Sequence, residues 1–189
     1  WYGSGKLKQP KSFLDIGCGG GDKTEAIVMR LGLPADICLG VDVFQPRIDR
    51  SKVFEFRLCD VAKGGLVESI PDGSRDLVIA LMSLHHVIDQ EAQIGTIKEM
   101  RRIVSKSGRI VLKEHDCPDA FFAHYLDEYH KYFSLMLNPS QSPSFALHAT
   151  YHSRAEWRCY FQSQGLELVH ASPIIFQSMR DYFDVFTLK

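Results

Sequence analysis

The residues best suited to ligand binding in this sequence are glycines and aspartates that follow short apolar runs. The run 12–16 leads into a turn whose glycines allow tight backbone geometry and close approach of a ligand. This turn contains Asp15, Gly17, Cys18, Gly19, Gly20 and Gly21. It lacks the Gly-Lys-Ser/Thr of a phosphate-binding loop, and Asp22 stands where the dinucleotide pattern requires its third glycine. The turn therefore predicts a ligand site of neither of these two kinds.

Two further acidic residues follow the next two predicted strands. Asp42 ends the second strand, where a carboxylate can accept hydrogen bonds from both hydroxyls of a ribose. Dehydrogenases use the same arrangement, so Asp42 alone does not identify the ligand. Val43 follows Asp42, and the pair Asp60 and Val61 follows the third strand. These residues all end or follow predicted strands that would end at one edge of the sheet.

The elements that would position these residues alternate between short apolar runs and helical periodicity, which favours a sheet flanked by helices. Strands are predicted at 12–16, 37–43, 54–58, 76–81, 109–113, 166–170 and 182–188, and helices at 24–31, 64–70, 89–104, 120–137 and 153–164, with a loop at 138–144. The last two strands have no helix between them, which favours an antiparallel pair. We expect the aromatic stripe of 120–137 to pack on the sheet. A length of 189 residues fits one domain, 1–189.

The glycine turn and the two later acidic residues, in this order, resemble class I S-adenosylmethionine-dependent methyltransferases of the type 11-like group. The resemblance implies a Rossmann-like α/β fold with helices on both faces of a seven-stranded, mostly parallel sheet. The implied strand order is 3-2-1-4-5-7-6, with the last strand antiparallel. The implied cofactor is S-adenosyl-L-methionine, and the product is S-adenosyl-L-homocysteine. In this family the glycine loop binds the methionine part, and the resemblance assigns cofactor contacts to Asp15, Gly17, Cys18, Gly19, Gly21, Asp42, Val43, Asp60, Val61, Leu81 and Met82.

Residues after the fourth and fifth strands could perform acid–base chemistry on a methyl acceptor. The segment 83–86, Ser-Leu-His-His, resembles both messenger RNA cap guanine-N7 methyltransferases and many small-molecule methyltransferases. The segment 113–116, Lys-Glu-His-Asp, resembles cap methyltransferase domains in replication polyproteins of negevirus-like RNA viruses, and its paired charges can shift each other's pKa. We predict catalytic roles for Lys113, Glu114, His115 and His85, and substrate contacts for His86, Asp116, Tyr151, His152 and Arg154.

Two acceptor classes stay open at this point. One is capped RNA, methylated at guanine N7, at ribose 2′-O or at both, and the other is a small molecule methylated at oxygen, nitrogen or carbon. The tetrad of pure 2′-O enzymes is not readable, because Leu81-Met82-Ser83 stands where its aspartate is expected. A non-catalytic domain and a nicotinamide-dependent oxidoreductase are weaker alternatives.

Composition adds expectations about partners and location. The net charge of −1 lacks the basic excess of a dedicated nucleic-acid module. No apolar run is long enough to cross a membrane, and five dispersed cysteines indicate a reducing compartment, so we expect a cytoplasmic protein. The start at Trp1 suggests a domain of a longer polyprotein, whose other domains are potential partners. His115, Asp116 and Cys117 could bind a metal, but without a second ligand cluster we predict no metal site.

Overall fold

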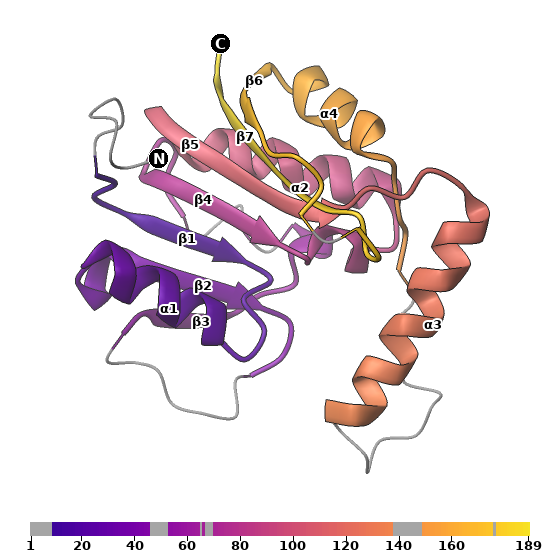
Figure 1. Cartoon of the computed structure of the whole chain (residues 1–189). Helices are drawn as coiled ribbons and strands as arrows, with labels where there is room; N and C mark the ends of the chain where they lie inside the picture. The colour runs from indigo at the N-terminus through magenta and orange to yellow at the C-terminus, as the bar shows by residue number, and fades with distance from the viewer. Residues whose placement is uncertain (1–8, 46–52, 65, 67–69, 138–148, 176) are drawn as a thin grey trace.

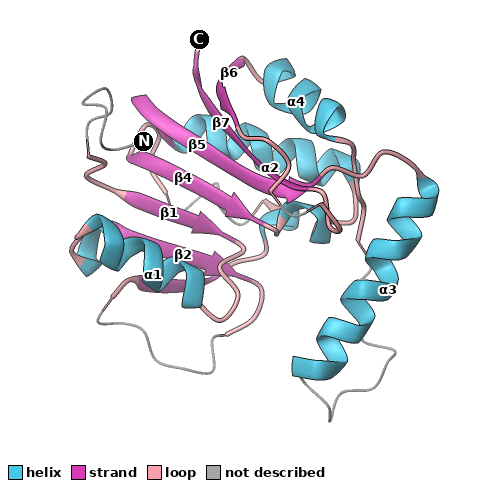
Figure 2. Ribbon diagram, in the orientation of Figure 1, coloured by secondary structure: helices cyan, strands magenta, loops and turns pink. Residues whose placement is uncertain are grey.

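The computed structural model describes residues 9–45, 53–64, 66, 70–137, 149–175 and 177–189, which form an α/β fold around one sheet (Figure 1, Figure 2). The strand order is β3-β2-β1-β4-β5-β7-β6. The strands are β1 (Phe13–Ile16), β2 (Cys38–Asp42), β3 (Glu55–Leu58), β4 (Arg75–Leu81), β5 (Val104–His115), β6 (Leu166–Ala171) and β7 (Asp181–Leu188). The predicted seven-stranded order is confirmed.

Strand directions also follow the prediction. β1 pairs in parallel with β2 and β4, β3 continues beyond β2, and β5 continues beyond β4. β7 runs antiparallel to both of its neighbours, β5 and β6. The carboxyl ends of β1 to β5 therefore meet at one edge, where open α/β sheets bind their ligands.

Helices cover both faces of the sheet. They are α1 (Asp22–Leu31), α2 (Gln90–Ile103), α3 (Ala120–Leu137) and α4 (Arg154–Ser163), with 3-10 turns η2 (Ala35–Ile37), η3 (Val61–Lys63) and η4 (Leu84–His86). Figure 1 shows α1 against β1 and β2 on one face and α2 on the opposite face. Two buried clusters match this arrangement: one includes Ile97 of α2 with Trp157 and Phe161 of α4, and the other includes Val28 of α1 with Phe54.

Capping interactions fix the ends of these helices. The Asp89 carboxylate accepts a hydrogen bond from the Ala92 amide at the start of α2. Ser153 and Glu156 form the predicted reciprocal capping box at the start of α4. Gly32, in the left-handed region at φ 64°, ends α1. Each such N-cap contributes about 1 kcal/mol, which explains why these boundaries were readable.

The fifth strand begins earlier than predicted, and this corrects the sequence analysis. We predicted a helix to 104 and a strand from 109, with Ser107 and Gly108 ending the helix, but β5 already starts at Val104, which pairs with Arg75. A Cβ at Gly108 would lie 2.7 Å from the Val104 side chain and 3.0 Å from the Arg75 carbonyl oxygen. Gly108 therefore allows two backbones to approach within a strand pair, and it does not terminate the preceding helix.

Several expectations concern parts of the chain that the structure describes incompletely. The predicted helix at 64–70 lies largely outside the described residues, and the predicted loop at 138–144 lies wholly outside them. No helix in the described ranges is both long and apolar enough to cross a bilayer. All five cysteines carry free thiols, and Cys159 alone among them is exposed.

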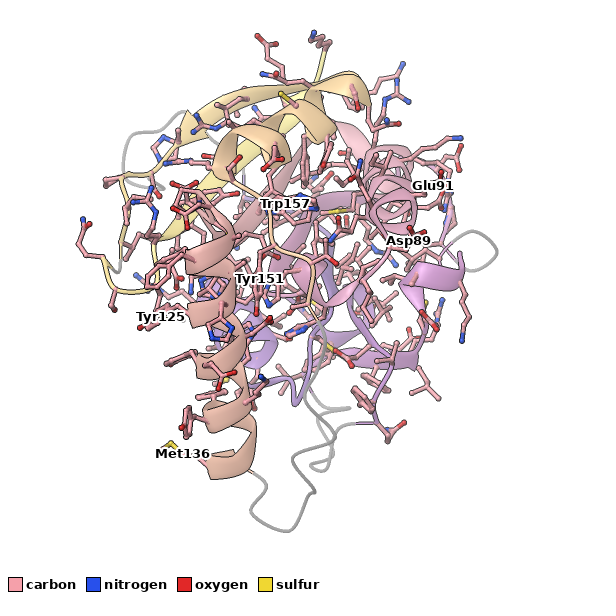
Figure 3. The ribbon with its side chains drawn as sticks, turned by 90° about the vertical axis from the view of Figure 1, so that its right-hand side faces the viewer. Asp89, Glu91, Tyr125, Met136, Tyr151 and Trp157 are labelled. Atoms are coloured by element: carbon pink, nitrogen blue, oxygen red, sulfur yellow. The ribbon has the colours of Figure 1, made fainter. Side chains whose placement is uncertain are left out.

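Helix α3 does not pack its aromatic stripe on the sheet, which corrects another expectation. Leu126 is fully buried, whereas Phe121 is 82% exposed and Tyr132 is 67% exposed. In Figure 1 α3 extends away from the sheet beyond the end of β5. Figure 3 shows Tyr125 and Met136 along the side of α3 that faces away from Tyr151. Because α3 contacts the rest of the fold over a short stretch, most of its aromatic rings face solvent.

Candidate active site

The glycine turn after β1 has the geometry of a backbone ligand site. Gly17, Gly19 and Gly21 all have positive φ, at 74°, 55° and 82°. A Cβ at Gly17 would lie 2.3 Å from the Ser83 Cβ, so only glycine lets this turn lie against the end of β4. A Cβ at Gly19 would meet no atom within 4 Å among the described residues. The turn is thus tightly packed on the sheet side and open above Gly19.

Buried contacts beneath the turn hold it in place. The amides of Gly17 and Cys18 both donate to the Val41 carbonyl, at 2.9 and 3.1 Å. Asp15 is 2% exposed, and one of its carboxylate oxygens accepts a 2.6 Å hydrogen bond from the Thr24 hydroxyl. Burial raises the pKa of Asp15 to about 6, although the Thr24 hydrogen bond acts in the opposite direction. Asp15 therefore supports the turn from below and does not lie on its open side.

Asp42 connects the turn to the end of β2. Its Oδ2 accepts from the Gly19 amide at 2.7 Å, and its Oδ1 accepts from the Phe44 amide at 3.0 Å. A carboxylate offers about four lone-pair sites, so two remain for the hydroxyls of a ribose. Val43, beside it, is 47% exposed. The residues present thus fit the nucleoside that the sequence analysis expected here.

The end of β3 is fixed beside the end of β2. The Cys59 amide donates to the Asp42 carbonyl at 2.8 Å. The Asp60 side chain accepts from the Ala62 amide at 3.1 Å and lies 3.1 Å from the Lys63 ammonium. These contacts place Asp60 and Val61 at the same edge as Asp42, where the resemblance assigned them cofactor contacts.

The end of β4 carries an unusual backbone conformation. Met82 has φ 61°, a left-handed value that costs roughly 1–2 kcal/mol for a residue with a side chain. Its amide donates to the Lys113 carbonyl at 2.8 Å, which holds the chain in this conformation. Such strain concentrates at functional sites. Leu81 and Met82 are half-buried at the carboxyl edge, where the cofactor methionine was expected.

Glu114 of β5 is buried and fixes η4, the turn that carries His85 and His86. It is 1% exposed, and its Oε1 accepts from the amides of Ser83 and Leu84 at 3.2 and 2.9 Å. Its Oε2 lies 2.5 Å from His85 Nδ1. Burial alone would raise the pKa of Glu114, but the His85 charge and hydrogen bond together hold this pKa below its usual value. Both carboxylate oxygens are engaged, so the structure places Glu114 as a group that positions His85.

Lys113 and His115 flank Asp181 of β7. Lys113 Nζ lies 2.7 Å from Asp181 Oδ2, and His115 Nδ1 lies 2.7 Å from Asp181 Oδ1. His115 Nδ1 also lies 3.0 Å from the Met179 carbonyl oxygen, so both polar neighbours of this nitrogen are hydrogen-bond acceptors. Carbonyl and carboxylate oxygens only accept, so Nδ1 carries the proton, and the lone pair of the neutral form of this imidazole lies on Nε2. This buried Nε2 has no hydrogen-bond partner among the described residues.

Four histidines and a tyrosine meet at this edge. The His85 ring centroid lies 4.1 Å from that of His86, 5.5 Å from His115, 5.1 Å from His130 and 5.5 Å from Tyr151. Burial, followed by the neighbouring imidazoles, lowers the pKa of His86 to about 2 and that of His130 to about 4. We call these five residues the histidine cluster. Its members His86 and His130 are neutral at neutral pH.

The structure adds two residues that sequence reasoning missed. His130 lies on α3 and accepts or donates a 2.7 Å hydrogen bond with the Tyr151 hydroxyl. Asp181 opens β7 and lies between Lys113 and His115. Neither residue belongs to a local motif, because both reach the site from elements distant in the sequence. His130 could have been assigned to the site only if the position of α3 across this edge of the sheet had been predicted.

Three residues that were predicted to contact the substrate form ion pairs and hydrogen bonds with other parts of the fold. Arg154 forms a 2.6 Å ion pair with Asp184 and lies 4.4 Å from the Tyr182 ring centroid. The Asp116 carboxylate accepts from the Arg154 amide at 2.8 Å. His152 is 8% exposed and bonds to Gln93 at 2.7 Å. These contacts favour a role in joining the start of α4 to the sheet and to α2, and the substrate roles remain predictions.

Fold and site together define the class of this protein. The seven-stranded order is shared with solved S-adenosylmethionine-dependent methyltransferases. The chain matches the methyltransferase domain family over residues 3–171 and belongs to that family.

Individual relatives agree with the family. Fusarielin synthase of Gibberella zeae is 31% identical over 119 residues, which are 57% of this chain but 4% of that much longer protein. A methyltransferase structure from Methanosarcina mazei is 15% identical with a TM-score of 0.66, over 98% of this chain and 96% of that chain. The 1,6-didemethyltoxoflavin-N1-methyltransferase of Burkholderia thailandensis is 14% identical with a TM-score of 0.67, over 96% and 72%. At these identities the two structures share the fold.

Proposed function

We propose that this methyltransferase acts on a planar acceptor that carries a ring nitrogen or a hydroxyl, bound where β4 and β5 end. The single observation behind this proposal is His115, a buried imidazole whose Nδ1 is bonded to a carbonyl and whose Nε2 lone pair is unpartnered among the described residues. S-adenosylmethionine supplies an electrophilic methyl group, and the protein positions the nucleophile. His115 Nε2 would accept the proton that a hydroxyl or an N–H acceptor must lose.

The surroundings of the histidine cluster favour a flat acceptor. Tyr129 of α3 lies 6.2 Å from the His130 ring, and Tyr129 stacks on Phe133 at 6.1 Å between centroids. Tyr129 and Phe133 are 41% and 48% exposed. Aromatic side chains stack on planar rings, including unpaired nucleobases. A row of exposed rings that continues from buried imidazoles therefore suits an acceptor with one flat ring near the reacting atom.

A small heteroaromatic molecule is the first candidate acceptor. The Burkholderia relative has 1,6-didemethyltoxoflavin bound in its structure and is described as an N1-methyltransferase. Another relative of the same fold, from Thermotoga maritima, is described as a possible histamine N-methyltransferase. The near-neutral net charge of −1 suits such an acceptor, because it offers no overall attraction to a polyanion.

The guanine of an RNA cap, as in a viral replication polyprotein, is the second candidate. Its support is the segment Lys113 to Asp116 and the exposed ring pair Tyr129 and Phe133, which could stack on a flipped base. Guanine N7 already has a lone pair and requires no base, whereas a ribose hydroxyl does. The role of His115 therefore differs between the two cap reactions.

Labelled methyl transfer to a fixed panel of acceptors tests both candidates. The panel contains short RNAs with an unmethylated cap, an N7-methylated cap and no cap, together with heteroaromatic amines and phenols. Label on the heteroaromatic compounds alone assigns a small-molecule acceptor, and label on the unmethylated cap alone assigns guanine N7. Label on both capped RNAs assigns ribose 2′-O chemistry. The absence of transfer to every compound, with cofactor binding intact, would contradict the proposed planar acceptor.

A further inference from the structure

Three histidines of the cluster lie close enough to share one ion. His85 and His86 come from η4, and His130 comes from α3. One ring nitrogen from each lies within 4.8 Å of one from each of the others. Tetrahedral zinc with Zn–N bonds of 2.0–2.1 Å sets its nitrogen ligands about 3.4 Å apart. The three nitrogens need to approach by no more than about 1.4 Å, which small rotations of the rings and of α3 can provide.

Two of the three rings are already oriented as metal ligands are. His85 Nδ1 is bonded to the Glu114 carboxylate, which leaves Nε2 directed away from that bond. His130 Nδ1 is bonded to the Tyr151 hydroxyl at 2.7 Å. Metal-binding histidines almost always bond their second nitrogen to a carboxylate, a carbonyl or water, which fixes the ring and raises its basicity. Glu114 performs this function for His85, and the Tyr151 hydroxyl can do the same for His130.

Unused nitrogens are an independent indication. His85 Nε2 and His86 Nδ1 are buried and find no hydrogen-bond partner in the described part of the chain. His85 as a whole is 1% exposed. A buried polar atom without a partner destabilises the folded protein, so two of them on neighbouring residues require an explanation. An ion bound between these nitrogens would remove that cost.

We propose that His85, His86 and His130 form a binding site for a divalent transition-metal ion. Neutral imidazoles suit zinc, nickel, copper and iron, whereas magnesium and calcium prefer oxygen ligands. Three protein ligands leave a fourth position open, as in catalytic zinc sites. That position can take water or an oxygen or nitrogen of the acceptor. The sequence analysis predicted no metal site because the metal-ligating residue types that it considered together were those at 115–117. His130 is far from His85 and His86 along the chain and meets them only in the folded structure.

The site differs from the proposed base. His115 is not one of the three ligands, so a metal at the site leaves its Nε2 available for a proton. The metal site therefore goes beyond the proposed function, and its test needs no acceptor. Binding can be present while methyl transfer to a given panel is absent, and the reverse is also possible.

Titration of the metal-stripped protein with Zn²⁺ and Co²⁺ tests the proposal. The protein carries Cys159→Ser, because this exposed thiol could bind zinc by itself. Calorimetry should show one equivalent of Zn²⁺ bound, and Co²⁺ should give the visible bands of a tetrahedral site without thiolate charge transfer. Failure to bind either ion, or a spectrum dominated by thiolate ligation, would overturn the proposal.

Matched variants locate the site. His86→Gln and His130→Gln should each lower zinc affinity at least tenfold, whereas His124→Gln on the same helix α3 should leave the affinity unchanged, because His124 is exposed and outside the group. Tyr151→Phe removes only the hydroxyl that holds His130 and should cost about 10-fold. Circular dichroism verifies that each variant is folded. Equal affinity in His130→Gln and His124→Gln would contradict the assigned ligands.

Discussion

The two halves of the carboxyl edge are built differently. At the ends of β1, β2 and β3 the groups predicted to bind the cofactor include backbone amides and the partly accessible Asp42, which accepts from the amides of Gly19 and Phe44. At the ends of β4 and β5 the functional groups are buried imidazoles held by carboxylates, as in the pair of His85 and Glu114. The first half is suited to holding a ligand of one fixed shape by hydrogen bonds. The second half is suited to proton transfer and metal binding, because buried polar groups interact strongly in a low dielectric.

This difference predicts that substitutions can impair the function of one half of the edge and leave that of the other half intact. Changes in the first half should weaken cofactor binding, and changes in the second should slow transfer or alter metal binding while cofactor binding persists. The following variants test that separation.

The largest effect is expected for Asp42→Ala. It removes both ribose hydrogen bonds, and a charged hydrogen bond contributes about 1.5–3 kcal/mol. Two such bonds together contribute about 3–6 kcal/mol, so cofactor affinity, measured by calorimetry with S-adenosylhomocysteine, should fall by about 10²–10⁴-fold. Turnover at saturating cofactor should change far less. Unchanged affinity would remove Asp42 from the cofactor site.

His115→Gln is the corresponding variant of the second half. Loss of a general base typically lowers turnover by about 10²–10⁴-fold, and glutamine cannot accept and hold the proton. We expect this loss in kcat for a hydroxyl or N–H acceptor, with cofactor affinity within about twofold of the parent. His124→Gln serves as the control. If both variants turn over equally, His115 does not act as the base.

Glu114→Ala tests how much the interactions of Glu114 with the 83–85 segment contribute to the free energy of unfolding. The change leaves the amides of Ser83 and Leu84 without their acceptor and His85 without its carboxylate. Breaking a buried pair in this way costs about 3–5 kcal/mol, which urea unfolding can measure. Glu114→Gln should keep most of the stability, because its carbonyl still accepts from both amides. A cost below about 1 kcal/mol for the alanine variant would show that the turn does not depend on Glu114.

The smallest effect concerns pH and Asp15. Its pKa rises on folding from 3.8 to about 6 because it is buried, so the folded state holds a proton that the unfolded state has released. Stability should therefore fall as pH rises from about 4 to about 6, by up to about 3 kcal/mol, and then level off. Asp15→Asn should lack this part of the pH dependence. Parallel stability curves for the two proteins would contradict the assignment.

The two halves also differ in how far the sequence predicted them. The turn from Asp15 to Gly21, Asp42 and Asp60 could be predicted as strand-end residues because each directly follows or ends a short apolar run, although the contacts between Gly19 and Asp42 join two strands. The fold could also be predicted from local patterns, since caps such as Ser153 with Glu156 act locally. The structure places all of these residues at the expected edge.

The histidine cluster could be predicted only in part. His85 and His115 were recognised as strand-end residues, but their partners His130, Tyr151 and Asp181 come from α3, from the segment before α4 and from β7. Their convergence depends on how α3 crosses the edge, which no local pattern encodes. For the same reason the exposed aromatic row of α3 was wrongly expected to pack on the sheet.

Chemical-shift mapping of the isotope-labelled protein with S-adenosylhomocysteine tests the division of the edge most directly. The account predicts shifts in the amides of Gly19, Val43, Val61 and Met82, with the side chains of His115 and His130 unchanged until an acceptor or Zn²⁺ is added. Chemical-shift changes centred on the histidines, with no change in the glycine turn, would contradict this division of the edge.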